Sequence, residues 1–208
     1  MKVLISVCNT GWVHKHVAMA LLKIQQDPRH QATVIMPTWV PYEHNLNRVV
    51  KDMINVYKDH DFWLNMDSDN PPVNNPLDLV ELDKDVRGLP TPVWANMKPG
   101  DQPYYYNVLD KKPGTEGWKP AVGEGLTEVD VTGSGCMLIH RRVLEKLDKP
   151  LFMREYDKDG IVTRGHDYLF CEHAQDAGFK IWTHFDYPCY HFNETELGEQ
   201  IKAFNDMK

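Results

Sequence analysis

The predicted architecture follows from one stretch of the chain, Asp61-Phe62-Trp63-Leu64-Asn65-Met66-Asp67-Ser68-Asp69-Asn70-Pro71-Pro72. Its apolar side chains predict a buried strand, which two carboxylates and a pair of prolines bring to an end. In an open α/β sheet the ligand crevice lies just beyond the carboxyl ends of the strands, so Asp67 and Asp69 are expected where a ligand binds. Hard oxygen ligands of this kind suit Mg²⁺ or Mn²⁺, which commonly bridge a carboxylate to a diphosphate.

The same residues are also typical of a turn. Asp, Ser and Asn side chains bond to their own backbone and Pro presets φ, so this sequence can form a turn without any ligand. A calcium-binding helix-loop-helix does not fit. Its loop needs an oxygen ligand at the fifth position and Gly at the sixth, where this chain has Pro71 and Pro72.

Length and composition indicate a globular protein. The 208 residues are enough for one domain or two closely joined halves. Charged residues make up 25% and hydrophobic residues 42%, and there is no apolar run of about 18 residues that would span a membrane. Residues 2–8 are predicted to form the first core strand and not a signal peptide, because their short apolar run leads straight into polar residues. A soluble, cytoplasmic protein is therefore expected.

Charge and cysteine content restrict the expected partners. The formal net charge of -7 disfavours sequence-independent nucleic-acid binding, which depends on Lys and Arg. The four cysteines are widely spread and include no Cys-x-x-Cys pair, so neither a structural zinc site nor a disulfide framework is predicted. A reducing, intracellular setting fits this pattern best.

The first half of the chain has the order of an α/β unit. Strands are predicted at residues 2–8 and 31–36, and helices at about 15–26 and 43–58, from their apolar periodicity. The loop with Asn9 and Thr10 follows the first strand, at the usual nucleotide end of such sheets. It lacks both the Gly-x-Gly-x-x-Gly fingerprint and a phosphate-loop Lys. Arg48, in the second helix, is either a solvated charge or a residue that reaches a nucleotide.

The second half contains shorter elements. Helices are predicted at residues 76–82 and about 141–147, and a further helix begins at Gly165-His166-Asp167 and ends at Gly178. Strands are predicted at residues 92–97, 104–109, 126–131, 179–183 and 187–191. Residues 193–208 are predicted to form a closing helix. Gly133 and Gly135 permit unusual φ and close backbone approach, which suits either a tight turn or a substrate seat.

The order of four motifs resembles the GT-A glycosyltransferases, most closely glycosyltransferase family 2, over residues 2–192. Asp67-Ser68-Asp69 looks like the family's Asp-x-Asp motif after a central strand. Residues 132–143 are similar to its glycine-containing acceptor-side segment, which leads to a basic helix. Residues 165–182 look like the acidic helix start and the following strand, and His191 falls where many metal-dependent members place a last metal ligand.

The resemblance implies a fold and a site. The fold is a single GT-A domain over residues 1–208, α/β in class, with a mixed, mostly parallel central sheet flanked by helices. About residues 1–100 would bind the nucleotide sugar and about 101–208 the acceptor. The implied donor-binding residues are Asn9, Thr10, Arg48, Asp67, Ser68 and Asp69; the metal ligands are Asp67, Asp69 and His191; the acceptor or sugar contacts are Gly133, Ser134, Gly135 and His166; and the catalytic base is Asp167.

Two departures from the family pattern bear on this site. The family commonly has Glu or Asp directly before the catalytic Asp, and this chain has His166. The order Asn47-Arg48 also differs from the commoner Arg-Asn pair, which leaves their nucleotide contacts open.

The chemistry can also be argued from the residues. A departing diphosphate is stabilised by a divalent ion acting as a Lewis acid, and an imidazole ligand such as His191 favours Mn²⁺, with Mg²⁺ possible. The attacking hydroxyl needs a base, and Asp167 can serve, although an Asp at that place can equally be a helix cap. The expected activity is transfer of a sugar from a nucleotide-sugar donor, UDP-linked, to a glycan or glycoconjugate. The transfer is expected to be inverting, although the sequence leaves a retaining mechanism open. A nucleotide-sugar hydrolase and a non-catalytic binding domain with this fold remain alternatives.

Overall fold

The computed structural model describes residues 1–94, 104–115 and 117–192. Its main feature is a seven-stranded sheet in the order β2-β1-β3-β11-β4-β14-β9. The strands are β1 (Lys2–Cys8), β2 (Gln31–Ile35), β3 (Phe62–Asp67), β4 (Val86–Gly88), β9 (Leu126–Val129), β11 (Cys136–His140) and β14 (Ile181–His184). The pairs β1–β2, β1–β3 and β4–β14 are parallel, whereas β11 and β9 run antiparallel to their neighbours. Five of the seven strands therefore point in one direction, which confirms a mixed, mostly parallel sheet.

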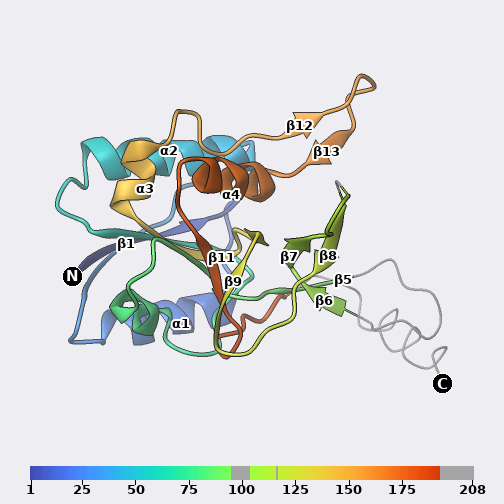
Figure 1. Ribbon diagram of the computed structural model, residues 1–208. Coiled ribbons are helices and arrows are strands. Elements are labelled where there is room, and N and C mark those ends of the chain that lie inside the picture. Colours follow the sequence, from blue (N-terminus) through green and yellow to red (C-terminus); the bar gives the residue numbers. More distant parts are fainter. Residues whose placement is uncertain (95–103, 116, 193–208) are drawn as a thin grey trace, which may run out of the picture.

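Helices cover both faces of this sheet (Figure 1). On one face lie α2 (Tyr42–Asn55), α3 (Arg141–Lys146) and α4 (His166–Asp176), and on the other lie α1 (Lys15–Gln25) and the short 3-10 helix η1 (Pro76–Glu81). The buried apolar side chains form two clusters, one beneath each set of helices. Because β3 lies between the two clusters, its first five residues are all buried, which explains its almost continuous apolar sequence.

Helix α2 shows how the sequence pattern produces this packing. It buries Leu46, Val49, Val50 and Met53, which recur at helical spacing on one face. Pro41 precedes its first turn, where the missing N–H costs no intrahelical hydrogen bond. The helix predicted over residues 43–58 is thereby confirmed, with its end a few residues earlier.

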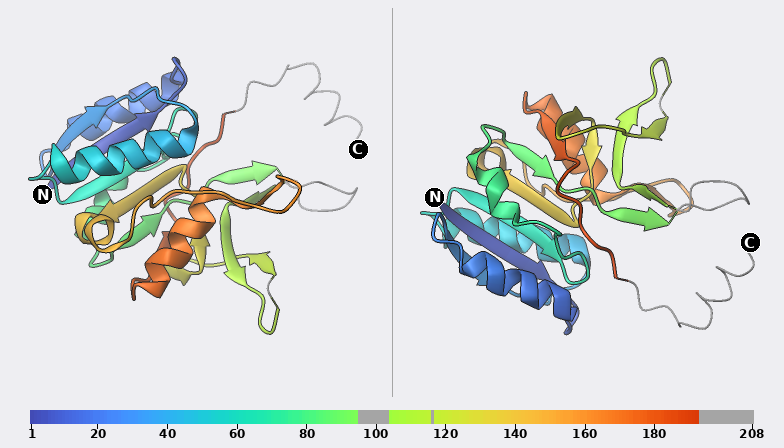
Figure 2. Two further views of the ribbon diagram at one scale, coloured as in Figure 1. Left: turned by 90° about the horizontal axis from the view of Figure 1, so that it is seen from above. Right: turned by 90° about the horizontal axis from the view of Figure 1, so that it is seen from below.

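Three small sheets accompany the central one. They contain β10 (Val131–Thr132), β7 (Val108–Lys111) and β8 (Trp118–Pro120); β12 (Glu155–Tyr156) and β13 (Val162–Arg164); and β5 (Pro92–Trp94) and β6 (Tyr104–Tyr106). Figures 1 and 2 show them gathered at the end of the central sheet opposite the N-terminus. The strand predicted at residues 126–131 is split between β9 and β10. The break is at Asp130, whose carboxylate accepts a 2.7 Å hydrogen bond from the Lys111 backbone N–H.

Two strands of the central sheet were not predicted. Strand β4 has a charged residue in its middle, Arg87, which is fully buried. Its guanidinium donates to the carbonyls of Leu79 and Leu82 at the end of η1, and lies 4.8 Å from the Phe62 ring centroid. The other strand, β11, follows directly on the glycine-containing segment that was interpreted as a turn or substrate seat.

One predicted strand is wrong. Residues 187–191 form a single β-bridge, between Pro72 and Cys189, and no regular strand. Pro71, Pro72 and Pro188 lack the N–H groups that a continuous ladder needs. The predicted helix at residues 193–208, and residues 95–97 of the strand predicted at 92–97, lie outside the described residues.

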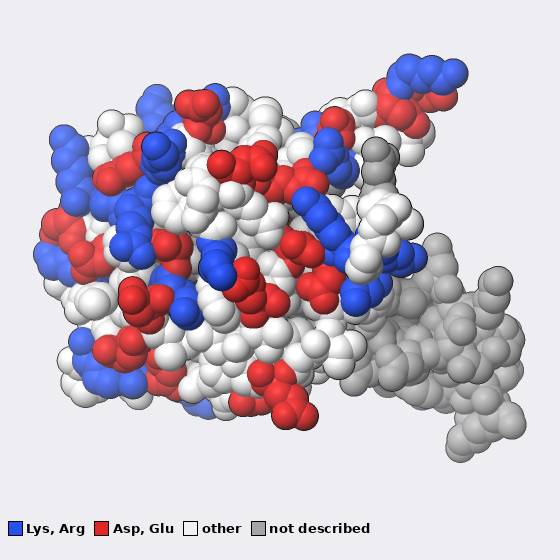
Figure 3. All heavy atoms as spheres, in the orientation of Figure 1, with Lys and Arg blue, Asp and Glu red and all other residues white. Residues whose placement is uncertain are grey.

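Acidic and basic side chains alternate over the face shown in Figure 3, with no broad area of a single charge. Across residues 1–94, 104–115 and 117–192, no helix has the length and apolar character needed to cross a bilayer.

Candidate functional site

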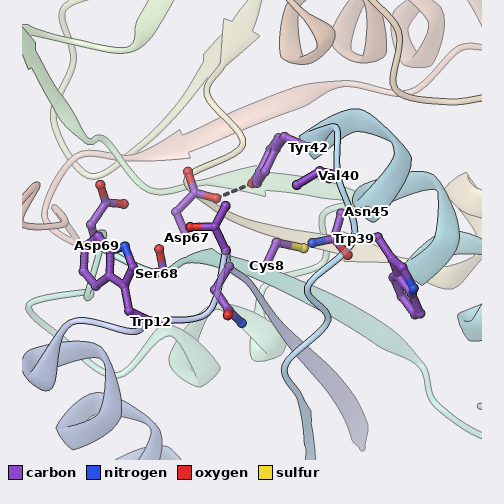
Figure 4. Close-up of a pocket in the computed structure, with 11 residues that line it drawn as sticks. Cys8, Trp12, Trp39, Val40, Tyr42, Asn45, Asp67, Ser68 and Asp69 are labelled. Atoms are coloured by element: carbon purple, nitrogen blue, oxygen red, sulfur yellow. Dashed lines mark hydrogen bonds between the residues drawn. The ribbon is translucent and has the colours of Figure 1, made fainter.

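A cavity of about 230 Å³ lies at the carboxyl ends of β1 and β3 (Figure 4). Its lining residues come from the ends of the two strands and from the segment that leads into α2; they are Cys8, Asn9, Thr10, Trp12, Trp39, Val40, Tyr42, Asn45, Asp67, Ser68 and Asp69. Five of the six residues expected to bind the donor thus line one cavity. The sixth, Arg48, lies behind the wall: its guanidinium is 5.3 Å from the Trp39 ring centroid and 3.4 Å from the Asp52 carboxylate.

Asp67 ends β3 and is held by groups from three segments. The Tyr42 hydroxyl donates a hydrogen bond to Asp67 Oδ1 across the cavity (Figure 4). The Asp67 backbone N–H donates to the Gly135 carbonyl at 2.7 Å. Asn65, buried two residues earlier, donates to the Tyr42 hydroxyl at 3.1 Å and to the Ser134 carbonyl at 2.7 Å. The carboxylate is therefore fixed by a buried polar network.

Burial makes the charge on Asp67 costly. Desolvation raises the pKa of Asp67 to about 6, against the hydrogen bond from Tyr42, and the negative charge of Asp69 adds to the rise. Burial likewise raises the pKa of Asp69, opposed by the nearby His191. Two adjacent carboxyl groups whose ionised forms are disfavoured create a strong preference for a cation at this place.

Asp67→Asn is expected to stabilise the metal-free protein at pH 7.5 by about 1–3 kcal/mol, because it removes a buried charge and keeps an oxygen for Tyr42 to bond. A carboxyl group with a raised folded-state pKa binds more protons in the folded than in the unfolded chain between about pH 4 and pH 6. The free energy of unfolding of the wild type should therefore fall as the pH rises from about 4 to about 6, and the advantage of the variant should vanish near pH 4. Urea unfolding in chelator at both pH values measures this. The exposed Asp148→Asn is the control, and equal stability of Asp67→Asn and wild type at pH 7.5 would contradict the burial argument.

His191 approaches Asp69 with a defined ring orientation. Its Nδ1 lies 2.8 Å from the Pro92 carbonyl oxygen, which can only accept, so Nδ1 carries the proton of the neutral ring. Its Nε2 lone pair then faces Asp69 Oδ2 at 3.7 Å. Two electron-pair donors that face one another favour a cation or proton between them. A carbonyl that fixes the other ring nitrogen is the usual second partner of a metal-binding histidine.

Backbone hydrogen bonds bring His191 to this place. The N–H groups of Tyr190 and Phe192 donate to the carbonyls of Pro71 and Asp69, each at 3.0 Å. The segment around His191 therefore runs alongside the loop that follows β3, although more than a hundred residues separate them in the sequence.

The three predicted metal ligands fit a divalent ion in chemistry. They offer two carboxylates and one imidazole, which is a suitable set for Mn²⁺. Among the residues that the structure describes, no three His, Cys, Asp or Glu side chains are already gathered closely enough to hold an ion. Asp69 and His191 face one another, while Asp67 is bonded to Tyr42.

The predicted acceptor-side residues lie around the β10–β11 connection and the start of α4. Gly133 is packed so closely that a Cβ there would stand 1.8 Å from Asn107 Nδ2. A Cβ at Gly135 would lie 3.5 Å from Asp67 Oδ2, so Gly135 borders the carboxylate. At the start of α4, the Asp167 carboxylate accepts a 3.1 Å hydrogen bond from the Tyr168 backbone N–H. Its charge adds, as the smallest of the causes, to the rise in the pKa of Asp67.

Several residues of the site were not found from the sequence. Tyr42 and Asn65 hold Asp67, and Glu43 faces the ring of His166, with Nδ1 3.4 Å from Oε1. The available signal was Asn65 itself, a polar residue inside an otherwise apolar strand, since a buried amide requires partners.

Comparison with known proteins identifies the fold. No family model and no curated protein sequence matches this chain. Among solved structures, A197 from STIV matches with a TM-score of 0.65 and 21% identity, over 93% of this chain and 87% of that chain. This chain therefore shares the fold of A197.

Two transferases are looser structural neighbours. The inositol-1-phosphate CTP transferase from T. maritima has a TM-score of 0.48 and 9% identity, over 99% of this chain and 94% of that chain. A glycosyltransferase involved in the glycosylation of the major capsid of PBCV-1 has a TM-score of 0.41 and 11% identity, over 99% of both chains. At these TM-scores neither decides what this chain does, so function has to be argued from the site.

Proposed function

We propose that this protein is a metal-dependent glycosyltransferase that moves a sugar from a UDP-linked donor to a glycan or glycoconjugate acceptor. The observation that carries the proposal is the cavity at the ends of β1 and β3. There two carboxylates with raised pKa values stand beside an aromatic-walled hollow, and His191 presents its Nε2 to one of them. A nucleoside diphosphate combines a flat base with a charged group that carries a cation, and the cavity offers a complement to both parts.

The diphosphate end of the donor is assigned to Asp67, Asp69 and His191. When bound, Mn²⁺ supplies Lewis-acid stabilisation of the departing diphosphate. Asp69 is the first choice for direct coordination, and Asp67 contacts the ion, the ribose or the sugar. Tyr42 holds the Asp67 carboxylate in place, and the Pro92 carbonyl keeps Nε2 of His191 as the coordinating nitrogen.

The base of the donor is assigned to the Trp39 end of the cavity, which lies away from Asp69 and Trp12 (Figure 4). Trp39 is 42% exposed, which is unusual for tryptophan and leaves ring surface for stacking. Arg48 lies against the Trp39 ring and steadies it. Asn45 donates to the Pro37 carbonyl at 3.1 Å, and within the described residues its buried Oδ1 has no partner. An unsatisfied acceptor favours a base with a ring N–H, as uracil has.

The reaction is assigned to Asp167 as base. Its carboxylate takes the proton of the attacking hydroxyl as that oxygen bonds to the anomeric carbon and the diphosphate leaves with its electron pair. One base and no covalent intermediate correspond to inversion.

Thermal unfolding with UDP, GDP, CDP and dTDP, each with Mn²⁺, with Mg²⁺ and with chelator, tests the donor site. A ligand at about one hundred times its dissociation constant stabilises a protein by about 2.7 kcal/mol, which is a rise of roughly 5–10 °C for a domain of this size. We expect the largest rise for UDP with Mn²⁺, and its loss in chelator. No rise with any nucleotide would refute the donor site.

Product analysis separates the transferase from its alternatives. A nucleotide-sugar hydrolase would release free sugar whether or not an acceptor is present, and a binding domain would show a nucleotide-dependent rise without turnover.

A further inference from the structure

A serine, a histidine and a glutamate are aligned beside the donor cavity. Ser134 Oγ lies 2.9 Å from His166 Nε2, and His166 Nδ1 lies 3.4 Å from Glu43 Oε1. The three residues come from the β10–β11 connection, the start of α4 and the first turn of α2, so only the fold brings them together. Ser134 and His166 are expected to contact the acceptor, but the sugar transfer proposed above gives no role to their alignment with Glu43.

The proton positions follow from the partners. Nδ1 faces Glu43 Oε1 at 3.4 Å, a contact longer than a regular hydrogen bond, and we assign the proton of the neutral imidazole to this nitrogen because a carboxylate only accepts. Nε2 then has a free electron pair, and the Ser134 hydroxyl donates to it. Arg154 pairs with the same Glu43 oxygen and holds that carboxylate in place. A hydroxyl bonded to a base whose other nitrogen faces an acid is the arrangement that activates serine nucleophiles.

The environment of His166 supports its role as a base. Burial lowers the pKa of His166, so the ring is neutral at pH 7, while the charges of Asp167 and Glu43 act in the opposite direction and Arg154 adds to the lowering. The aromatic rings of Tyr42 and Phe152 lie 5.3 Å and 6.3 Å from the imidazole and complete its surroundings.

Two backbone N–H groups adjoining the Ser134 side chain could serve as oxyanion donors. The backbone N–H groups of Ser134 and Gly135 have no acceptor within the described part of the chain. The N–H of the residue that follows a nucleophilic serine is a common oxyanion donor. Ser134 is 6% exposed, so the hydroxyl is sheltered from bulk water.

We propose that Ser134, His166 and Glu43 form a catalytic triad that acts on small acyl esters, an activity separate from sugar transfer. Ser134 Oγ bonds to the carbonyl carbon as its proton passes to His166 Nε2. The ester C–O bond breaks, and the leaving alcohol takes that proton from His166. Water then attacks the acyl-serine, gives a proton to His166, and releases the carboxylic acid as the proton returns to Ser134.

Covalent labelling of the 208-residue chain tests the triad independently of sugar transfer. Diisopropyl fluorophosphate and the smaller methanesulfonyl fluoride are the probes, and mass spectrometry locates the modified residue. We expect one adduct, on Ser134, formed with loss of fluoride, and none on the urea-denatured chain. His166→Gln should slow labelling by about 10²–10⁴-fold, and Glu43→Gln by at least about 10-fold.

A matched control separates the triad from general damage to the fold. Glu172→Gln removes a carboxylate of α4 that pairs with Arg164 of β13. This variant should be labelled at the wild-type rate. p-Nitrophenyl acetate hydrolysis should be abolished in Ser134→Ala, with thermal unfolding used to check that the variant is folded. Absence of a Ser134 adduct with both probes, or equal rates in folded wild type and His166→Gln, overturns the proposal. Because no nucleotide or sugar is used, neither result bears on the donor-site assignment, which is tested separately by nucleotide binding.

Discussion

Asp167→Asn is expected to lower the rate of sugar transfer by about 10²–10⁴-fold and to leave nucleotide binding unchanged. An amide cannot take the proton of the attacking hydroxyl, and general-base catalysis contributes about this much to rate. Asn keeps a side-chain oxygen for the Tyr168 backbone N–H, which Asp167 bonds at 3.1 Å, so the start of α4 should stay folded. The measurement is the transfer rate at saturating donor, with nucleotide binding followed by thermal unfolding.

The control is Asp176→Asn, an exposed carboxylate at the other end of α4. It should transfer sugar at the wild-type rate. Transfer by Asp167→Asn at the wild-type rate would show that the base lies elsewhere.

Asp69→Ala is expected to abolish the metal-dependent rise in unfolding temperature, which corresponds to at least about a 100-fold weaker binding of the nucleotide with Mn²⁺. The substitution removes the carboxylate that faces His191 Nε2 at 3.7 Å, and with it the first choice for direct coordination. Asp69 is in the turn that follows β3 and not in the core strand itself, so the fold should tolerate the change.

His191→Ala sharpens this test. Loss of an imidazole should weaken binding with Mn²⁺ more than binding with Mg²⁺, because imidazole is the better ligand for manganese. Asp148→Ala, on the exposed surface, serves as control. A chelator-sensitive rise of wild-type size in Asp69→Ala would exclude this residue as a ligand.

The sequence was informative where elements are long and locally encoded. Strands β1, β2 and β3 and helices α1 and α2 were predicted to within a few residues, because each carries an uninterrupted apolar pattern. Strand β4 was missed because Arg87 looks like a surface residue. Its guanidinium bonds to the carbonyls of Leu79 and Leu82 and lies against the Phe62 ring, contacts that no local pattern reveals.

The site divides in the same way. Asp67, Ser68 and Asp69 line the cavity and are consecutive in the sequence, directly at the end of a strand. The motif could therefore be found from the sequence as a unit. Tyr42, Glu43 and Asn65 could not, because their roles depend on hydrogen bonds and ion pairs between α2, β3, α4 and the β10–β11 connection. A residue whose function is to hold another residue is visible only once the two elements are packed together.

The way in which His191 reaches Asp69 also determines when the site can exist during synthesis of the chain. The two carboxylates are synthesised first, at and just after the end of β3. The Gly135 carbonyl that bonds the Asp67 N–H comes later, and the imidazole follows more than a hundred residues after the carboxylates, on the segment that pairs with residues 69–73. A nascent chain that ends before residue 191 has the acidic half of the site and lacks its nitrogen. If His191 is a ligand, as proposed, tight manganese binding would be acquired only once the chain extends to residue 191, after all seven strands of the central sheet have been synthesised.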